Sequence, residues 1–305
     1  MHLLKEMEML MKRNRFRIFS ALCIALFAVS CICGCVDQNQ GKSKSGADAD
    51  YELIATSPAV ANICGKLNLD LVAVCNTGYE LPEQYVELPR IGMPMSPDLE
   101  KISFINPDYI LSPSTLKDDL EVKYQSIGQD YIFLDLKSVQ GMYKSIEDLG
   151  NKFGREKEAE ELVCDFNEFM DEYKDAHKDK EKPTVLVLMG LPGSYIVATE
   201  NSYVGNLVEL AGGQNVFSGT DEEFLNCNTE SMKVKEPDVI LRAAHGMPEQ
   251  VIEEFAEEFN TNQIWKHFKA VEEGRVYDLD SNYFNMSANF GYKEALEQLE
   301  PMLYE

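Results

Sequence analysis

From residue 51 onward, short runs rich in β-branched and aromatic residues alternate with stretches of helical periodicity. The first half predicts four strands, at residues 51–56, 71–75, 109–112 and 131–134. The second half predicts four more, at 184–189, 195–198, 239–241 and 276–279. Such alternation is typical of α/β folds. A chain of 305 residues also exceeds what one compact core usually holds, so the pattern predicts two α/β lobes.

Between the two sets of strands lies a long helical region. Apolar residues at steps of three and four run from Ala159 to Tyr173 and predict a helix over 155–178. At 1.5 Å per residue this helix would be about 36 Å long, enough to reach from one lobe to the other. A charged run followed by Pro183 ends it. The alternative interpretation is an ordinary surface helix of one domain.

The two halves share a short phrase. Glu100 is followed by Pro107-Asp108 and a buried apolar run, and Glu230 is followed at the same spacing by Pro237-Asp238 and a similar run. Each copy predicts a short helix that carries the glutamate, a turn and a buried strand. The repeat therefore favours a pseudo-symmetric, two-lobed body.

Ligands of two-lobed α/β proteins bind near the carboxyl ends of the strands. The candidates in this position follow the repeated strands of the two halves: Ser112, Pro113 and Ser114, and Arg242, Ala243, Ala244 and His245. His245 precedes the turn Gly246-Met247-Pro248, and its place at a strand end favours a ligand role over a structural one.

The N-terminus has the pattern of a lipoprotein signal. A basic segment at 12–17 precedes an apolar run at 18–34, which is short for a membrane span and ends at a lipobox-like Cys35. Cys31 is a second candidate for cleavage. Residues 36–50 are polar and predict a flexible tether. We therefore expect a signal at 1–35, a tether at 36–50, lobes at 51–137 and 183–305, and linking helices at 138–182.

Charge and motifs narrow the function classes. The net charge of −24 argues against non-specific binding to nucleic acid or to an anionic bilayer and favours a basic partner surface. The chain has no Gly-x-Ser-x-Gly, His-Glu-x-x-His, Walker or dinucleotide-binding motif. Cys64 is a nucleophile in principle but has no identifiable histidine partner, and Cys75 and Cys164 are expected to be buried thiols. The sequence therefore predicts a binding protein, not an enzyme.

A methionine of the first half forms a candidate pair with His245. We expect Ser96 to cap a helix that begins at Pro97, which places Met95 just outside that helix. Such a methionine usually packs as a hydrophobic staple. A thioether and an imidazole are, however, a recurrent axial pair for haem iron, so Met95 and His245 are candidate haem ligands.

Four stretches together resemble the haem-binding lipoproteins within the iron-siderophore and cobalamin class of ABC-transporter binding proteins. They are IATSPAVANIC, IGMPMSPDLEKI, GLPGSYIVATENSYVGNLVELAGGQNVF and ILRAAHGMPEQV. The resemblance covers about residues 50–305 and implies two Rossmann-like lobes joined by a long interdomain helix. It also implies that Met95 and His245 ligate haem iron, although Met93, two residues away, is a second thioether. Glu100 and Glu230 correspond to the glutamates that dock on permease arginines.

The resemblance further implies residues that line the cleft: Thr56, Ser57, Ala59, Ser194, Tyr195 and Tyr203. For each of these the alternative is ordinary packing. The haem propionates are expected at helix N-termini, near a base such as Arg242, or in solvent.

The expected function is that of a haem receptor, lipid-anchored through Cys35 on the extracellular face of the cell membrane. It would take haem b as cargo and deliver it to an ABC permease and its ATPase. A surface protein that donates haem is a further candidate partner. The main alternative is a ferric-siderophore or corrinoid binding protein of the same fold. A sensor or adhesion lipoprotein without a transport role is an alternative of another class.

Overall fold

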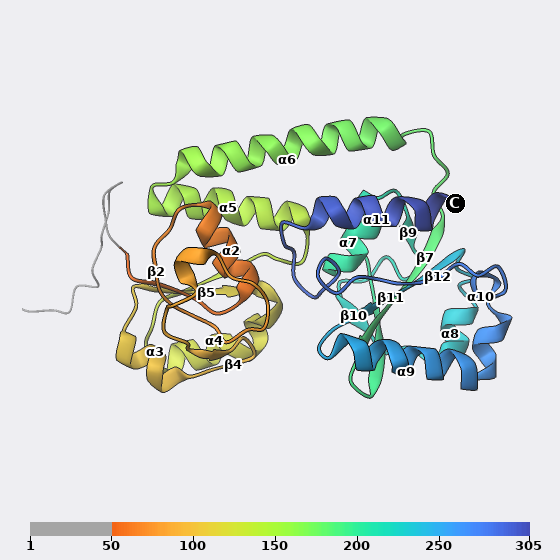
Figure 1. The fold of residues 1–305 in the computed structure, drawn as a ribbon, viewed down its shortest axis with the longest axis horizontal. Coiled ribbons are helices and arrows are strands. Elements are labelled where there is room, and N and C mark those ends of the chain that lie inside the picture. Colours follow the sequence, from red (N-terminus) through yellow and green to blue (C-terminus); the bar gives the residue numbers. More distant parts are fainter. Residues whose placement is uncertain (1–50) are drawn as a thin grey trace, which may run out of the picture. The chain divides into compact units, whose positions relative to one another are not determined.

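The computed structural model describes residues 51–305, and its first sheet is entirely parallel (Figure 1). The strands are β1 (Leu53–Ala55), β2 (Leu71–Val74), β5 (Tyr109–Pro113) and β6 (Tyr131–Leu134), in the order β2-β1-β5-β6. The helices α2 (Pro58–Lys66), α3 (Leu99–Ile105) and α4 (Lys117–Ser126) connect them, and β3 (Gly92–Met93) pairs with β4 (Ser96–Pro97). We call this part the N-terminal lobe. The predicted signal, the candidate lipid site Cys35 and the tether lie outside the described residues.

The second sheet is mixed. Its strands are β7 (Thr184–Leu191), β8 (Ser194–Ala198), β9 (Gln214–Asn215), β10 (Phe224–Leu225), β11 (Val239–Ala244) and β12 (Val276–Asp278), in the order β10-β8-β7-β11-β12 with β9 beside β7. The helices are α7 (Tyr203–Leu210), α8 (Thr229–Lys233), α9 (Pro248–Thr261), α10 (Lys269–Glu272) and α11 (Tyr292–Tyr304). A short 3₁₀ turn lies at Gln263–His267, and two others, at Glu83–Tyr85 and Ser114–Leu116, belong to the N-terminal lobe. We call this part the C-terminal lobe.

All eight strands predicted from the sequence are present, but β8 runs antiparallel to β7. Pro192 and Gly193 form a tight turn between them, and Gly193 has the left-handed φ of 80° that a glycine adopts without strain. The Pro-Gly pair is a turn signal that the strand pattern alone does not convey. The neighbour on this side of the central first strand is therefore parallel in the first sheet, where it is β2, and antiparallel in the second, where it is β8.

Two helices connect the sheets. Helix α5 (Val139–Phe153) and helix α6 (Glu156–His177) pack against each other, and α6 continues alongside α11 (Figure 1). With 22 residues α6 is about 33 Å long. Its contact with α11 is specific, because the Tyr173 hydroxyl donates to the Leu296 carbonyl and Lys180, just beyond the helix, pairs with Glu300 at 2.6 Å. The predicted linking helix is therefore present, and the interpretation as a helix confined to one domain is wrong.

Strand residues point alternately to two apolar layers. In β11, Val239, Leu241 and Ala243 belong to a core that runs through α5, α7 and α11 and includes residues of both lobes. Ile240 and Ala244 face the opposite layer, under α9. This period of two is what a strand buried on both faces requires. The core shared by the two lobes anchors the linking helices to both sheets.

The repeated phrase has the same structure in both lobes. Asp108 Oδ2 accepts a hydrogen bond from Glu52 N at 2.9 Å, and Asp238 Oδ2 accepts one from Thr184 N at 3.0 Å. Each aspartate therefore fastens the central first strand of its own sheet. The residue before each proline is left-handed, with φ of 52° at Asn106 and 46° at Glu236. The pseudo-repeat inferred from a few letters is thus a real structural repeat with an offset of 130 residues.

Candidate functional site

Met95 lies in a small hairpin and not at a helix start. Strands β3 and β4 pair Met93 with Ser96, and Pro94 and Met95 form the turn between them. Gly92 has a φ of 93°, and a Cβ there would lie 2.9 Å from backbone atoms of Ser96 and Asp98, so the hairpin requires glycine at this position. Met93 and Met95 are both exposed, at 57% and 63%. Either is accessible to a ligand.

The predicted cap at Ser96 is wrong. Helix α3 begins at Leu99, and Asp98 Oδ1 accepts from Lys101 N at 3.1 Å. An aspartate caps as well as a serine does, and the pairing of Ser96 with Met93 removes it from that role. Hydrogen bonds from backbone N–H groups, first that of Lys101, lower the pKa of Asp98. Met95 therefore has no helix to staple and remains free at the surface.

His245 immediately follows β11. Its N–H donates to the Gly190 carbonyl at 2.9 Å, which extends the pairing of β11 with β7 by one residue. The ring atom Nδ1 is buried and has no hydrogen-bond partner in the described chain. Burial lowers the pKa of His245, which favours the neutral imidazole. A neutral imidazole with an uncommitted nitrogen is the form that coordinates a metal.

The turn after His245 is unusual. Gly246 and Met247 are both left-handed, with φ of 67° and 47°, and Pro248 then opens α9. A left-handed methionine is disfavoured, and such outliers cluster at functional positions. Met247 is also exposed, so a third thioether lies two residues from His245. Its residue type is visible in the sequence, but its backbone conformation is not.

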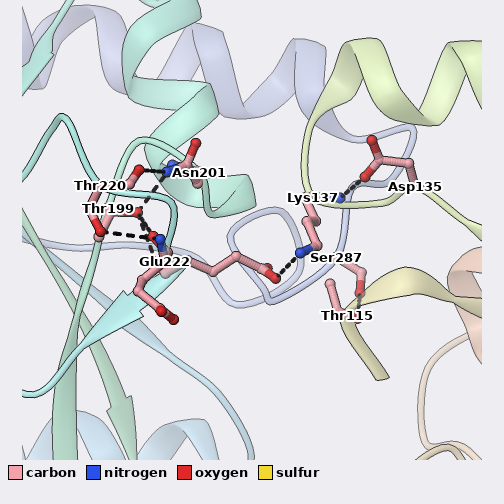
Figure 2. A network of polar contacts seen from close by, with 9 residues as sticks. Thr115, Asp135, Lys137, Thr199, Asn201, Thr220, Glu222 and Ser287 are labelled. Carbon is pink, nitrogen blue, oxygen red and sulfur yellow. Dashed lines mark hydrogen bonds and ion pairs between the residues drawn. The ribbon is translucent and has the colours of Figure 1, made fainter. Parts of the chain in front are cut away.

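The segment before α5 is joined to the C-terminal lobe by polar contacts (Figure 2). Lys137 Nζ lies 2.6 Å from Glu223 Oε1, and the Ala288 N–H donates to the Leu136 carbonyl at 2.8 Å. Thr115 and Ser287 share a hydrogen bond of 3.4 Å. Thr199 Oγ1 donates to the Glu222 carbonyl, and the Asn201 amide donates to the Thr220 carbonyl, so the loop that carries Glu223 is held in place. Sequence reasoning did not find these contacts, because they join residues far apart in the chain.

Several residues predicted to line the cleft have structural roles. Thr56 is buried, and its hydroxyl bonds to Ser112 Oγ at 2.6 Å. Ser57 caps α2 by accepting from Val60 N. Tyr203 is 1% exposed and packs in the shared core, which corrects its assignment to a ligand-lining surface. Ala59 is half-buried.

Ser194 and Tyr195 line a pocket within the C-terminal lobe, between the β7–β8 hairpin and α9. Its volume is about 530 Å³. The Tyr195 hydroxyl donates to Glu258 Oε1 at 3.2 Å, and Glu254 Oε2 accepts from Gly193 N at 2.7 Å. The hydroxyl and both carboxylates are therefore already partnered.

Arg242 is also committed to partners. Its Nε and Nη2 donate to the two Asp278 oxygens at 2.7 and 2.6 Å, and its guanidinium lies over the Phe259 ring at 4.8 Å. Such a bidentate, stacked arginine is held by its own lobe. The suggestion that it meets a propionate is therefore not supported.

The side chains of the two glutamates predicted to dock on a permease, Glu100 and Glu230, make no polar contact within residues 51–305. Glu100 lies in the first turn of α3 and Glu230 in the first turn of α8, and both are exposed. Neither carboxylate makes an ion pair or hydrogen bond within residues 51–305. Their charges are therefore available to a partner.

The cysteines separate into two groups. Burial raises the pKa of the Cys64 thiol to about 12 and that of Cys75 to about 11, so neither is a reactive thiolate. Cys164 is exposed on α6, and the prediction that it is buried is wrong, because the buried stripe of this helix runs through Ala159, Phe166 and Met170. Within residues 51–305 there is no group of three or more His, Cys, Asp or Glu side chains placed to hold a metal ion.

No helix in the described part of the chain is both long and apolar enough to cross a membrane.

Comparisons with known proteins cover almost the whole chain. The periplasmic binding protein family matches residues 53–283. The high-affinity heme uptake system protein IsdE of Staphylococcus aureus strain Newman is 39% identical over 290 residues, which is 95% of this chain and 99% of that protein. The crystal structure of S. aureus IsdE complexed with heme covers 84% of this chain and all of that one, with a TM-score of 0.81.

A second solved structure gives the same result. An ABC transporter substrate-binding protein from Listeria monocytogenes EGD-e is 46% identical, covers 84% of this chain and 99% of that one, and has a TM-score of 0.80. The fold of two Rossmann-like lobes joined by a long helix is thereby confirmed, and these relatives are binding proteins of transporters and not enzymes. The chain belongs to the periplasmic binding protein family.

Proposed function

We propose that this protein binds haem and delivers it to an ABC permease for iron acquisition. The observation that carries the proposal is the match to IsdE in complex with heme, at 39% identity over 84% of the chain and a TM-score of 0.81. The relative from S. aureus is a heme uptake system protein, and the match spans 99% of its length. No reaction is catalysed, since haem is cargo and leaves unchanged.

Met95 and His245 are the iron ligands in this proposal, and haem lies between the lobes 51–137 and 183–305. The side chain of Met95 is exposed at a hairpin turn of one lobe, and burial lowers the pKa of His245 of the other lobe, which favours its neutral form. One ligand from each lobe would hold the ring with its two faces toward different lobes. The linking region 138–182 then keeps the lobes together as haem enters. Apolar contacts with the porphyrin supply most of the affinity, and ligation sets the orientation.

The partners follow from charge and from the N-terminal sequence. Glu100 and Glu230 present unpaired carboxylates to the permease, which works with its ATPase. Haem is received at the cell surface, with a haem-donor protein as the upstream partner. Cys35 carries the lipid that holds the chain on the extracellular face of the membrane. Labelled palmitate should enter the wild type and not the Cys35→Ala variant, and label retained in that variant would move the site to Cys31.

An absorption titration tests the function. Purified protein lacking residues 1–35 is titrated with ferric haem, and in parallel with cobalamin and a ferric siderophore. We expect saturation at one haem per chain and a low-spin, six-coordinate spectrum. Tight binding of cobalamin or siderophore without haem binding would overturn the proposal in favour of another cargo.

A further inference from the structure

Among residues 51–305, the two most exposed large apolar side chains are Phe104 and Val234. Phe104 is 91% exposed and Val234 is 81% exposed. A single exposed apolar residue needs no explanation. These two are informative because each belongs to one copy of the structural repeat.

The positions of Phe104 and Val234 are equivalent. Phe104 lies four residues after Glu100, and Val234 lies four residues after Glu230. Asp98 caps α3 two residues before its glutamate, and Asn228 caps α8 two residues before its own. Four residues make one helical turn, so each apolar side chain lies on the same face as its glutamate.

The opposite side of each turn is packed against its lobe. Ile102 and Met232, which lie midway between the glutamate and the apolar residue, are both fully buried. Each glutamate and its apolar neighbour therefore stand outward together. We call the pair Glu100 and Phe104 the N-terminal docking pair, and Glu230 and Val234 the C-terminal docking pair.

We infer that each docking pair is one contact point for the permease, with the glutamate meeting a basic side chain and Phe104 or Val234 filling an apolar pocket beside it. This inference rests on the proposed function. A surface repeated twice in one chain fits a partner built from two equivalent halves, each offering a base and a pocket. Phe104 is the larger anchor, so the N-terminal docking pair contributes more.

Charge favours the permease over two other occupants of this surface, a second copy of the chain and an anionic lipid surface. The chain has a net charge of −24, so a second copy would bring like charges together at both pairs. An anionic lipid surface would repel the same glutamates. Lys233 and Lys235 flank Val234, but their ammonium groups lie over the rings of Phe268 and Phe217, at 6.0 and 5.3 Å. The chain as a whole is strongly acidic, and Glu100 and Glu230 make no ion pair within residues 51–305, which favours a basic protein surface.

The glutamates and the apolar residues act on different rates. Charges at the rim of an interface mainly change the association rate and its salt dependence. Apolar groups buried in a partner's pocket mainly slow dissociation. The inference therefore predicts separable kinetic effects for two residues that lie one turn apart.

The experiment measures binding of the haem-loaded protein to its permease–ATPase complex in lipid nanodiscs. We expect Phe104→Ser with Val234→Ser to raise the Kd about tenfold or more, mainly through faster dissociation, with the salt dependence unchanged. Glu100→Gln with Glu230→Gln should slow association and flatten the salt dependence. Val122→Ser is the matched control, because Val122 is 70% exposed on α4 but outside the repeat.

Several outcomes would overturn the inference. One is a wild-type dissociation rate in the Phe104→Ser, Val234→Ser variant, and another is an equal loss of permease affinity in Val122→Ser. A third is a loss of affinity for empty nanodiscs as large as the loss for the permease. The last is a dimer of the wild type that the double variant does not form. The haem spectrum of each variant is recorded first. A wild type that binds no haem would instead count against the proposed function. Failure of the inference and failure of the proposed function are therefore distinguishable.

Discussion

Strand β5 of the N-terminal lobe and strand β11 of the C-terminal lobe occupy the same place in their sheets, yet they carry different chemistry. Ser112 of β5 pairs in register with Phe133, and its hydroxyl links those of Thr56 and Tyr124 at 2.6 and 2.9 Å. The equivalent residue of β11 is Arg242, which pairs in register with Asp278 and binds its carboxylate. One lobe buries a chain of hydroxyls where the other holds an ion pair.

The residues that follow these strands differ as well. Thr115 of the N-terminal lobe contacts Ser287 and helps join the two lobes. Its equivalent in the C-terminal lobe is His245, whose Nδ1 has no partner within the described residues. The repeat therefore preserves the backbone and the hydrogen bonds by which Asp108 and Asp238 hold the first strand of each sheet, which we call the aspartate clamps. The polar groups at the strand ends differ between the lobes. A site built from such lobes is expected to be asymmetric, with unequal contributions from the two sides.

The largest expected effect is the loss of His245. His245→Ala should abolish the low-spin haem spectrum and most of the affinity, because imidazole is the stronger iron ligand. Met95→Ala should retain haem through His245 and apolar contacts but change the spin state of the iron. Absorption spectra and haem titrations of both variants measure the difference.

Met93 requires a control, since its thioether is as accessible as that of Met95. Met93→Ala alone should leave the spectrum unchanged, and Met93→Ala with Met95→Ala should match Met95→Ala. A wild-type spectrum in both the His245→Ala variant and the double methionine variant would disprove the axial pair. A larger effect of Met93→Ala than of Met95→Ala would assign the ligand to Met93.

The next effect separates stability from binding at Arg242. Arg242→Ala removes two short hydrogen bonds to Asp278 and the stacking on Phe259, and should lower the free energy of unfolding by about 2 kcal/mol. Because its guanidinium is held within its own lobe, haem affinity should not change. Urea unfolding and haem titration of the same preparation test both statements. A weaker haem affinity with unchanged stability would restore Arg242 as a propionate contact.

The sequence predicts the scaffold much better than the site. All eight predicted strands and the long helix follow from periodicity and turn residues, which are local properties. The repeat around Pro107-Asp108 and Pro237-Asp238 was visible because each copy fits one backbone conformation. The roles of Thr56, Tyr203 and Arg242 depend on partners from other strands and helices, which no local pattern encodes. The pattern predicts Ser96 as the cap, but Asp98, two residues later, is an equally good cap and takes that role.

A smaller effect on stability is expected from breaking the chain of hydroxyls formed by Thr56, Ser112 and Tyr124, which has no equivalent in the C-terminal lobe. The equivalent of Thr56 is Leu188, which is fully buried, so an apolar side chain is accommodated at this place in the other lobe. Thr56→Val should cost about 1 kcal/mol of unfolding free energy, because Ser112 and Tyr124 still bond to each other. Tyr124→Phe is the matched variant for the other end of the chain. A loss of haem affinity in Thr56→Val without a loss of stability would return Thr56 to the ligand site.

The smallest effect concerns the aspartate clamp that the two lobes share, and it depends on pH. Hydrogen bonds from the Thr184 N–H and hydroxyl, followed by Lys269, lower the pKa of Asp238 below its ordinary value of 3.8. The folded state therefore binds the proton less readily than the unfolded state does. The carboxylate stabilises the fold fully above about pH 4, and this contribution is lost as the pH falls through the lowered value.

Asp238→Asn should thus be less stable than the wild type at pH 7, and the difference should shrink as the pH is lowered below about 4. Lys269→Gln is the control, because the Thr184 bonds precede Lys269 among the causes of the shift and it should weaken the effect only slightly. Urea unfolding of the three proteins between pH 3 and pH 7 measures it. A difference between wild type and Asp238→Asn that is constant across this range would show that geometry, and not the carboxylate charge, makes the clamp.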